Sequence, residues 1–198
     1  MINKVINIDV DYAAMGTEPS PRQTTLTTYI LDDKNIVDSG NVNRPAIIVC
    51  PGGSYAFTAS REAEPIALKY CAAGFHAFVL DYSVAPAGWP AAICELSKAV
   101  SYVRKIADEN KIDKNKLFVA GFSAGGHLVA SLGVHWNHPD VVKYSGISDG
   151  SNRPNGIILG YPVITGEEEK THMGTINLFT AGREFVRPLA WLEKYVTD

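Results

Sequence analysis

The stretch Gly121-Phe122-Ser123-Ala124-Gly125 joins a short apolar run, Leu117–Ala120, to a helical pattern over Ala124–Val134. A G-x-S-x-G pattern between a strand and a helix is typical of a nucleophile elbow, a strained turn that lifts a serine hydroxyl above a sheet. The five letters alone are only suggestive, but their position between a strand and a helix favours the elbow. We therefore predict that Ser123 is a nucleophile.

The neighbours of Ser123 suit this role. Gly121 and Gly125 are small flanks that allow a helix and a strand to pack closely. The turn also directs the N–H of Ala124 and the positive end of the following helix toward the point where an oxyanion would develop. The alternative interpretation is a glycine-rich tight turn that binds nothing.

A second glycine-containing segment, Pro51-Gly52-Gly53-Ser54-Tyr55, directly follows the buried run Ala46–Cys50. In hydrolases with such an elbow, the loop after this strand supplies the other oxyanion donors, often from an H-G-G-G motif. By position, we predict oxyanion N–H groups from Gly53 and Ser54, with Gly52 shaping the turn. A plain loop is the alternative, but the occurrence of both motifs in the expected order favours the functional interpretation.

The rest of the chain predicts the fold class. Six β-rich runs are predicted strands: Val5–Val10, Thr24–Leu31, Ala46–Cys50, His76–Asp81, Leu117–Ala120 and Gly156–Gly160. Helical patterns separate the later runs: Glu62–Ala73, Pro90–Ile106 and Ala124–Val134. This alternation predicts an α/β fold with a mostly parallel sheet and helices on both faces. Because no repeat or linker divides the chain, we expect residues 1–198 to form a single domain.

Composition narrows the classes of partner. The net charge is −3, and 46% of the residues are hydrophobic. This composition does not predict a basic face that could bind nucleic acid or anionic lipid. Met1–Gly16 lacks the apolar core of a signal peptide, and no stretch approaches a membrane span. Cys50, Cys71 and Cys94 have no metal-binding spacing, which indicates three reduced thiols in a cytoplasmic protein. We expect a small, weakly charged substrate, no metal, and neither nucleic acid nor membrane as partner.

Four segments resemble bacterial α/β-hydrolase esterases, in particular the branch of lipase/esterase and acetylxylan-esterase-like proteins. These segments are Pro51–Tyr55, Arg61–Pro65, Asp81–Pro86 and Gly121–Leu128. In this sequence, Pro51 and Ser54 replace the first His and the last Gly of the H-G-G-G pattern. The resemblance implies an α/β-hydrolase fold, a serine carboxylesterase acting on short acyl groups such as acetate on a sugar, and no cofactor.

The partners that would activate Ser123 are harder to find. Asp81 precedes Ser123, against the serine, acid, histidine order of this fold, and is expected to make structural hydrogen bonds. His127 lies one helical turn after Ser123 and is expected to pack beneath it. Three further histidines are expected at the surface or in irregular chain: His135, His138 and His172.

In the order of the family, the acid follows a strand after Gly156–Gly160 and the histidine follows one more. The residues after Tyr161 show instead a loop, an acidic run, and the helical pattern Arg187–Val196. The sequence therefore predicts an esterase domain without its last C-terminal strands, with an exposed sheet edge and a tendency to form homo-oligomers. The alternative is a catalytically silent α/β-hydrolase-like protein that binds a ligand or takes part in an assembly.

Overall fold

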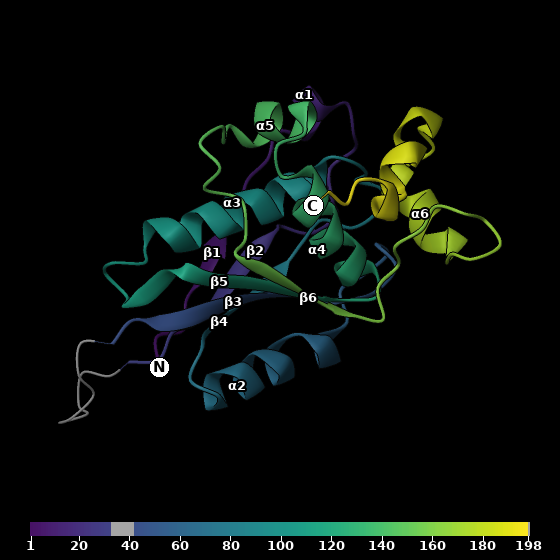
Figure 1. The fold of residues 1–198 in the computed structure, drawn as a ribbon. Helices are drawn as coiled ribbons and strands as arrows, with labels where there is room; N and C mark the ends of the chain where they lie inside the picture. The colour runs from purple at the N-terminus through teal and green to yellow at the C-terminus, as the bar shows by residue number, and fades with distance from the viewer. Residues whose placement is uncertain (33–41, 198) are drawn as a thin grey trace.

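The computed structural model describes residues 1–32 and 42–197, which are built around a six-stranded sheet (Figure 1). The strands are β1 (Val5–Asn7), β2 (Thr25–Tyr29), β3 (Arg44–Cys50), β4 (His76–Asp81), β5 (Ile112–Phe122) and β6 (Gly156–Gly160). They lie in the order β1-β2-β4-β3-β5-β6. Strands β3 to β6 are parallel, and β1 and β2 extend the sheet in antiparallel pairing. The predicted mostly parallel sheet is confirmed.

Helices cover both faces of this sheet. The helices of the described residues are α1 (Tyr12–Met15), α2 (Glu64–Ala72), α3 (Ala91–Lys105), α4 (Ala124–His135), α5 (Pro139–Ser145) and α6 (Met173–Thr180). Helix α2 packs on one face, and α3 and α4 pack on the other (Figure 1). In β3, Ile47 and Val49 point into the α2 layer while Ile48 points into the α3 and α4 layer. None of the helices in the described part of the chain is long and apolar enough to cross a bilayer.

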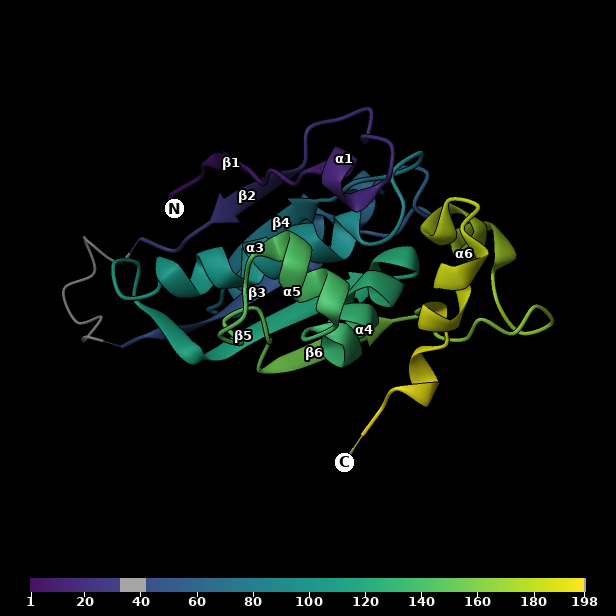
Figure 2. The same ribbon diagram turned by 90° about the horizontal axis from the view of Figure 1, so that it is seen from above.

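The C-terminal part differs from the sequence prediction. Helix α6 occupies a stretch expected to be irregular, and Figure 2 shows it beside the end of the sheet where the parallel strands finish. The predicted helix Arg187–Val196 is wrong, because the chain there forms the 3-10 turns Glu184–Ala190 and Leu192–Lys194. Pro188 lies inside the first of these turns, where its missing N–H interrupts α-helical hydrogen bonding.

Strand β6 is the edge of the sheet in the described residues. Ile157, Ile158 and Leu159 are 39%, 44% and 37% exposed. Side chains alternate between the two faces of a strand, so exposure of three consecutive residues means that neither face is fully covered. The exposed apolar edge expected from the sequence is therefore present.

All three cysteines are buried, free thiols. Cys50 ends β3, Cys71 lies in α2 and Cys94 lies in α3. Burial raises the pKa of each thiol above its ordinary value. Cys50 is the one closest to the predicted site, because the loop that begins at Pro51 follows it directly.

Candidate active site

Ser123 lies at the junction of β5 and α4, in a conformation that a non-glycine residue rarely adopts. Its φ is 51° and its ψ is −116°. The Ser123 N–H donates to the Gly160 carbonyl oxygen at 2.9 Å. The Ser123 carbonyl oxygen accepts from the N–H groups of His127 at 2.9 Å and Val163 at 3.3 Å. The exit of β6 and the first turn of α4 thus hold the serine in its strained conformation.

Two glycines allow α4 to start directly against the sheet. A Cβ at Gly125 would overlap the carbonyl oxygens of Cys50 and Pro51, and one at Gly121 would overlap the Gly125 carbonyl oxygen. These obstacles are backbone atoms, which cannot move aside as a flexible side chain can. The two predicted flanks of Ser123 therefore lie where only a hydrogen atom fits.

The loop after β3 lies against Ser123. A Cβ at Gly52 would lie 3.1 Å from Ser123 Cβ and 2.8 Å from the Phe122 carbonyl oxygen. Cys50 and Gly121 pair directly in the parallel β3–β5 ladder, so the two segments that follow them emerge at the same sheet edge. The structure therefore brings together the two motifs singled out in the sequence, which are about seventy residues apart.

Hydrogen bonds within this loop fix the directions of its peptide groups. The Gly52 carbonyl oxygen accepts from the Ala59 N–H, and the Gly53 carbonyl oxygen accepts from the Ala56 N–H, each at 2.9 Å. The Gly52–Gly53 and Gly53–Ser54 peptide bonds are both trans. In a trans peptide group, the N–H of one residue points opposite to the C=O of the residue before it. The N–H groups of Gly53 and Ser54 therefore point away from the interior of the loop's own turn.

The same geometry applies to Ala124. Its N–H belongs to the peptide whose carbonyl oxygen, on Ser123, is occupied by His127 and Val163. It therefore points outward from the first turn of α4, where N–H groups have no partner within the helix and the helix dipole is positive. Three N–H groups, those of Gly53, Ser54 and Ala124, thus belong to the segments that flank Ser123.

Residues at the end of β4 and directly after it hold the loop in place. The Tyr82 hydroxyl donates to the Pro51 carbonyl oxygen at 2.6 Å, and burial keeps the pKa of this phenol well above its usual range. Asp81 accepts a hydrogen bond from Thr58 at 2.6 Å and pairs with Arg22 at 3.2 Å. The structural role expected for Asp81 is confirmed.

His127 is fully buried behind Ser123. Its Nδ1 shares a hydrogen bond of 2.9 Å with the Tyr55 hydroxyl. Burial lowers the pKa of the imidazole to about 3, so the ring is neutral at physiological pH. It contacts Tyr55 and not the Ser123 hydroxyl, and the packing role expected from the sequence agrees with this position.

The other histidines also lie away from Ser123. His172 begins α6, where its Nδ1 accepts from the Thr175 N–H at 3.2 Å. His135 was expected at the surface, but it is buried and its Nε2 lies 3.2 Å from the Leu189 carbonyl oxygen. Across residues 1–32 and 42–197, the Ser123 hydroxyl has no hydrogen-bond partner.

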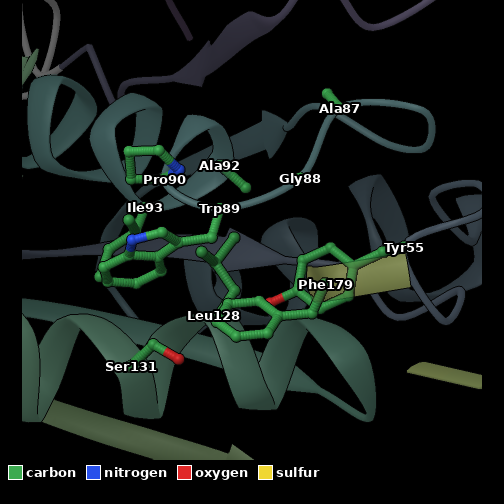
Figure 3. A pocket seen from close by; sticks show the side chains of 10 residues that line it. All are labelled: Tyr55, Ala87, Gly88, Trp89, Pro90, Ala92, Ile93, Leu128, Ser131 and Phe179. Atoms are coloured by element: carbon green, nitrogen blue, oxygen red, sulfur yellow. The ribbon is translucent and has the colours of Figure 1, made fainter. Parts of the chain in front are cut away.

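A small, partly open cavity lies beside the loop, between α3, α4 and α6 (Figure 3). Tyr55, Trp89, Leu128 and Phe179 are among the residues that line it, and so is Ser131, whose hydroxyl has no hydrogen-bond partner in the described residues. Its volume is about 10 Å³, which is on the order of the space that one water molecule needs. As it stands, the cavity is too small for the acyl group of a substrate.

Sequence comparisons place the chain in a family. A family model described as BD-FAE matches residues 35–159, which is more than half of the chain. Endo-1,4-beta-xylanase B of Butyrivibrio fibrisolvens is 36% identical in an alignment of 171 residues that covers 80% of this chain and 26% of that protein. The chain spans about a quarter of the length of the curated relatives it matches.

Solved structures show the same fold. The acetyl ester-xyloside bifunctional hydrolase from Caldicellulosiruptor lactoaceticus aligns with a TM-score of 0.79 and 30% identity, over 98% of this chain and 70% of that one. The carboxylesterase Cest-2923 from Lactobacillus plantarum WCFS1 also aligns with a TM-score of 0.79, at 27% identity, over 100% of this chain and 68% of that one. The chain therefore belongs to the BD-FAE family and has the fold of the α/β-hydrolase esterases.

Proposed function

We propose that this chain carries the nucleophile and the oxyanion hole of a serine carboxylesterase. The observation that supports this most is the strained Ser123 beside N–H groups of Gly53, Ser54 and Ala124 that are not used by the turns around them. Ser123 Oγ would attack the acyl carbonyl carbon, and the carbonyl oxygen would become an anion facing these donors. Collapse of this intermediate expels the alcohol, and water then releases the acid from the acylated serine.

The backbone donors suit a charge that appears only in the transition state. Removing one such donor from a serine hydrolase costs about 10²–10³ in turnover, or roughly 3–4 kcal/mol. Here the donors are main-chain groups on a loop and a helix start that are fixed by other hydrogen bonds. They therefore need little reorganisation when the oxyanion forms.

We further propose that the imidazole and carboxylate that complete the site lie outside residues 1–198. A serine hydroxyl needs a general base to lose its proton, and a carboxylate orients that base. All five histidines of the chain lie within the described residues, and none of their imidazole rings is hydrogen-bonded to the Ser123 hydroxyl. The two solved esterases, of which the chain covers 70% and 68%, are long enough to contain further segments.

For the substrate, we propose short acyl esters, with acetylated carbohydrates as the first class to test. One structural relative is described as an acetyl ester-xyloside hydrolase, and a curated relative is named a xylanase. A weakly charged chain with backbone oxyanion donors is compatible with a neutral ester. The second candidate is a catalytically silent binding protein, which the missing contact between Ser123 and an imidazole favours.

Covalent modification of Ser123 separates the two candidates. Without base and acid, an oxyanion hole and binding still provide roughly 10³–10⁴-fold acceleration over water. We therefore expect a fluorophosphonate to modify Ser123 slowly but selectively, and added imidazole to accelerate this reaction by serving as an external base. Peptide mapping by mass spectrometry would locate the modified serine.

The control for this experiment is Ser131→Ala, which removes the buried hydroxyl of a different serine, in α4. Labelling should survive in Ser131→Ala and disappear in Ser123→Ala. Label distributed over several serines, or absent even with imidazole, would refute the esterase site and favour the silent binding protein.

A further inference from the structure

A buried carboxylate lies beside Ser123 without a role in the reaction described above. Glu62 is 7% exposed. Its Oε2 accepts a hydrogen bond from the Gly52 N–H at 2.8 Å, and its Oε1 accepts one from the Tyr161 hydroxyl at 3.0 Å. The guanidinium of Arg61 approaches Oε1 at 3.4 Å, but that side chain is largely exposed. The two hydrogen bonds are therefore the main contacts that compensate for burial of the charge.

These contacts connect the two segments that flank Ser123. Gly52 belongs to the loop after β3, and Tyr161 directly follows β6. The residue before Tyr161, Gly160, accepts the N–H of Ser123. Tyr161 itself has a positive φ of 35°, so its backbone is strained where its side chain reaches Glu62. The carboxylate thus ties the loop on one side of the serine to the strand exit on the other.

The contact also sets the orientation of the loop. The Gly52 N–H is directed to Glu62 while the Gly52 carbonyl oxygen is directed to Ala59, so both peptide groups of Gly52 are fixed. The second of these groups contains the N–H of Gly53. Hydrogen bonds to an ionised carboxylate are roughly twice as strong as neutral ones. Glu62 therefore holds the first of the proposed oxyanion donors in its direction.

We propose that Glu62 is a positioning residue for the oxyanion hole, acting through the Gly52 N–H and the Tyr161 hydroxyl. The inference rests on the proposed esterase function. Glu62 is distinct from the carboxylate that would orient the base, because it precedes Ser123, against the serine, acid, histidine order of this fold, and its two oxygens accept from the Gly52 N–H and the Tyr161 hydroxyl. Loss of the carboxylate would let the Gly52 and Gly53 peptide groups turn, and the oxyanion would lose a donor.

The test compares substitutions at Glu62 with one at a second buried carboxylate. In Glu62→Gln, the amide oxygen can still accept a hydrogen bond from the Gly52 N–H, but the negative charge and the acceptor for the Tyr161 hydroxyl are lost. Glu62→Ala removes both hydrogen bonds.

The control is Glu95→Gln in α3. Glu95 is fully buried, and it accepts hydrogen bonds from the Ser83 N–H at 2.8 Å and the Tyr12 hydroxyl at 3.2 Å. Neither of these partners contacts Ser123.

We expect the rate of Ser123 phosphonylation to fall about tenfold or more in Glu62→Ala. This decrease is smaller than the roughly 10²–10³-fold loss expected when one oxyanion donor is removed completely. Glu62→Gln should show a smaller decrease, and Glu95→Gln should keep the wild-type rate. Tyr161→Phe removes only one bond and should fall between Glu62→Gln and wild type. The Gly52 amide provides a spectroscopic signature: its proton resonance should move upfield and its exchange protection should fall in both Glu62 variants, but not in Glu95→Gln.

The outcomes separate the two proposals. Absence of label on wild-type Ser123 would refute the esterase site, and the role of Glu62 with it. A labelled wild type with an unchanged rate in Glu62→Gln and Glu62→Ala would refute the role of Glu62 alone. Equal decreases in Glu62→Gln and Glu95→Gln would also refute it, because they would reflect general destabilisation.

Discussion

Purified residues 1–198 are expected to hydrolyse p-nitrophenyl acetate about 10⁶-fold more slowly than an α/β-hydrolase esterase with a complete triad, the loss seen when the triad of a serine protease is removed. The reason is that the Ser123 hydroxyl has no base within the described residues. The imidazole nearest along the chain, that of His127, is neutral and bonded to Tyr55. Any remaining acceleration would come from the oxyanion donors and from binding.

Release of p-nitrophenol would be followed over hours and compared with Ser123→Ala under the same conditions. The difference between the two proteins should be close to the detection limit and should grow when imidazole is added. Robust turnover that Ser123→Ala abolishes would contradict this prediction. It would show that a histidine such as His172 moves to Ser123, or that a partner chain completes the site.

Gly125→Ala is expected to lower the free energy of unfolding by about 3 kcal/mol, at the upper end of the usual cost of overpacking. The new methyl group would overlap the carbonyl oxygens of Cys50 and Pro51, and either α4 or the end of β3 would have to move. The same movement would displace the loop beside Ser123. Urea denaturation followed by circular dichroism measures the change in stability, and phosphonylation measures the change at the site.

A second glycine in the same helix provides the matched control. A Cβ at Gly133 would meet only the side chain of Ile157, at 3.1 Å, and Ile157 lies on the exposed edge strand. Replacing a helical glycine by alanine gains about 1 kcal/mol of helix propensity. Gly133→Ala should therefore be neutral or stabilising. Equal changes in the free energy of unfolding of the two variants would show that close packing does not explain why position 125 is a glycine.

The strands that form the core could be predicted because their pattern is local. Ala46–Cys50 is a continuous apolar run, and so is β4 between its polar ends His76 and Asp81, as is typical of strands buried on both faces of a sheet. Strand β5 was predicted too short, since it begins at Ile112 and not at Leu117. Its first part is polar and largely exposed, and there hydrophobic periodicity gives no signal for a strand.

The site shows the same division between local and distant information. Ser123 and the glycines around it could be singled out because each motif is a short segment at a strand end. Glu62 lies within Arg61–Pro65, one of the four segments that resemble the esterases, but the sequence assigned no role to it. Its partners are 10 and 99 residues away in the sequence, and only the folded sheet brings them together. The burial of His135 was missed for a similar reason, because its partner Leu189 lies 54 residues further along the chain.

Burial of the thiols has a consequence for oxidative chemistry. Peroxides and electrophiles attack the thiolate, and a raised pKa together with exclusion of solvent keeps that form scarce. Cys50 matters most, because its side chain is fully buried in the core and an oxygen added to its sulfur would have to be accommodated there, directly before the loop that begins at Pro51. The reaction proposed for Ser123 should therefore not depend on redox conditions. This holds even though a cysteine directly precedes the loop that would stabilise the transition state of that reaction.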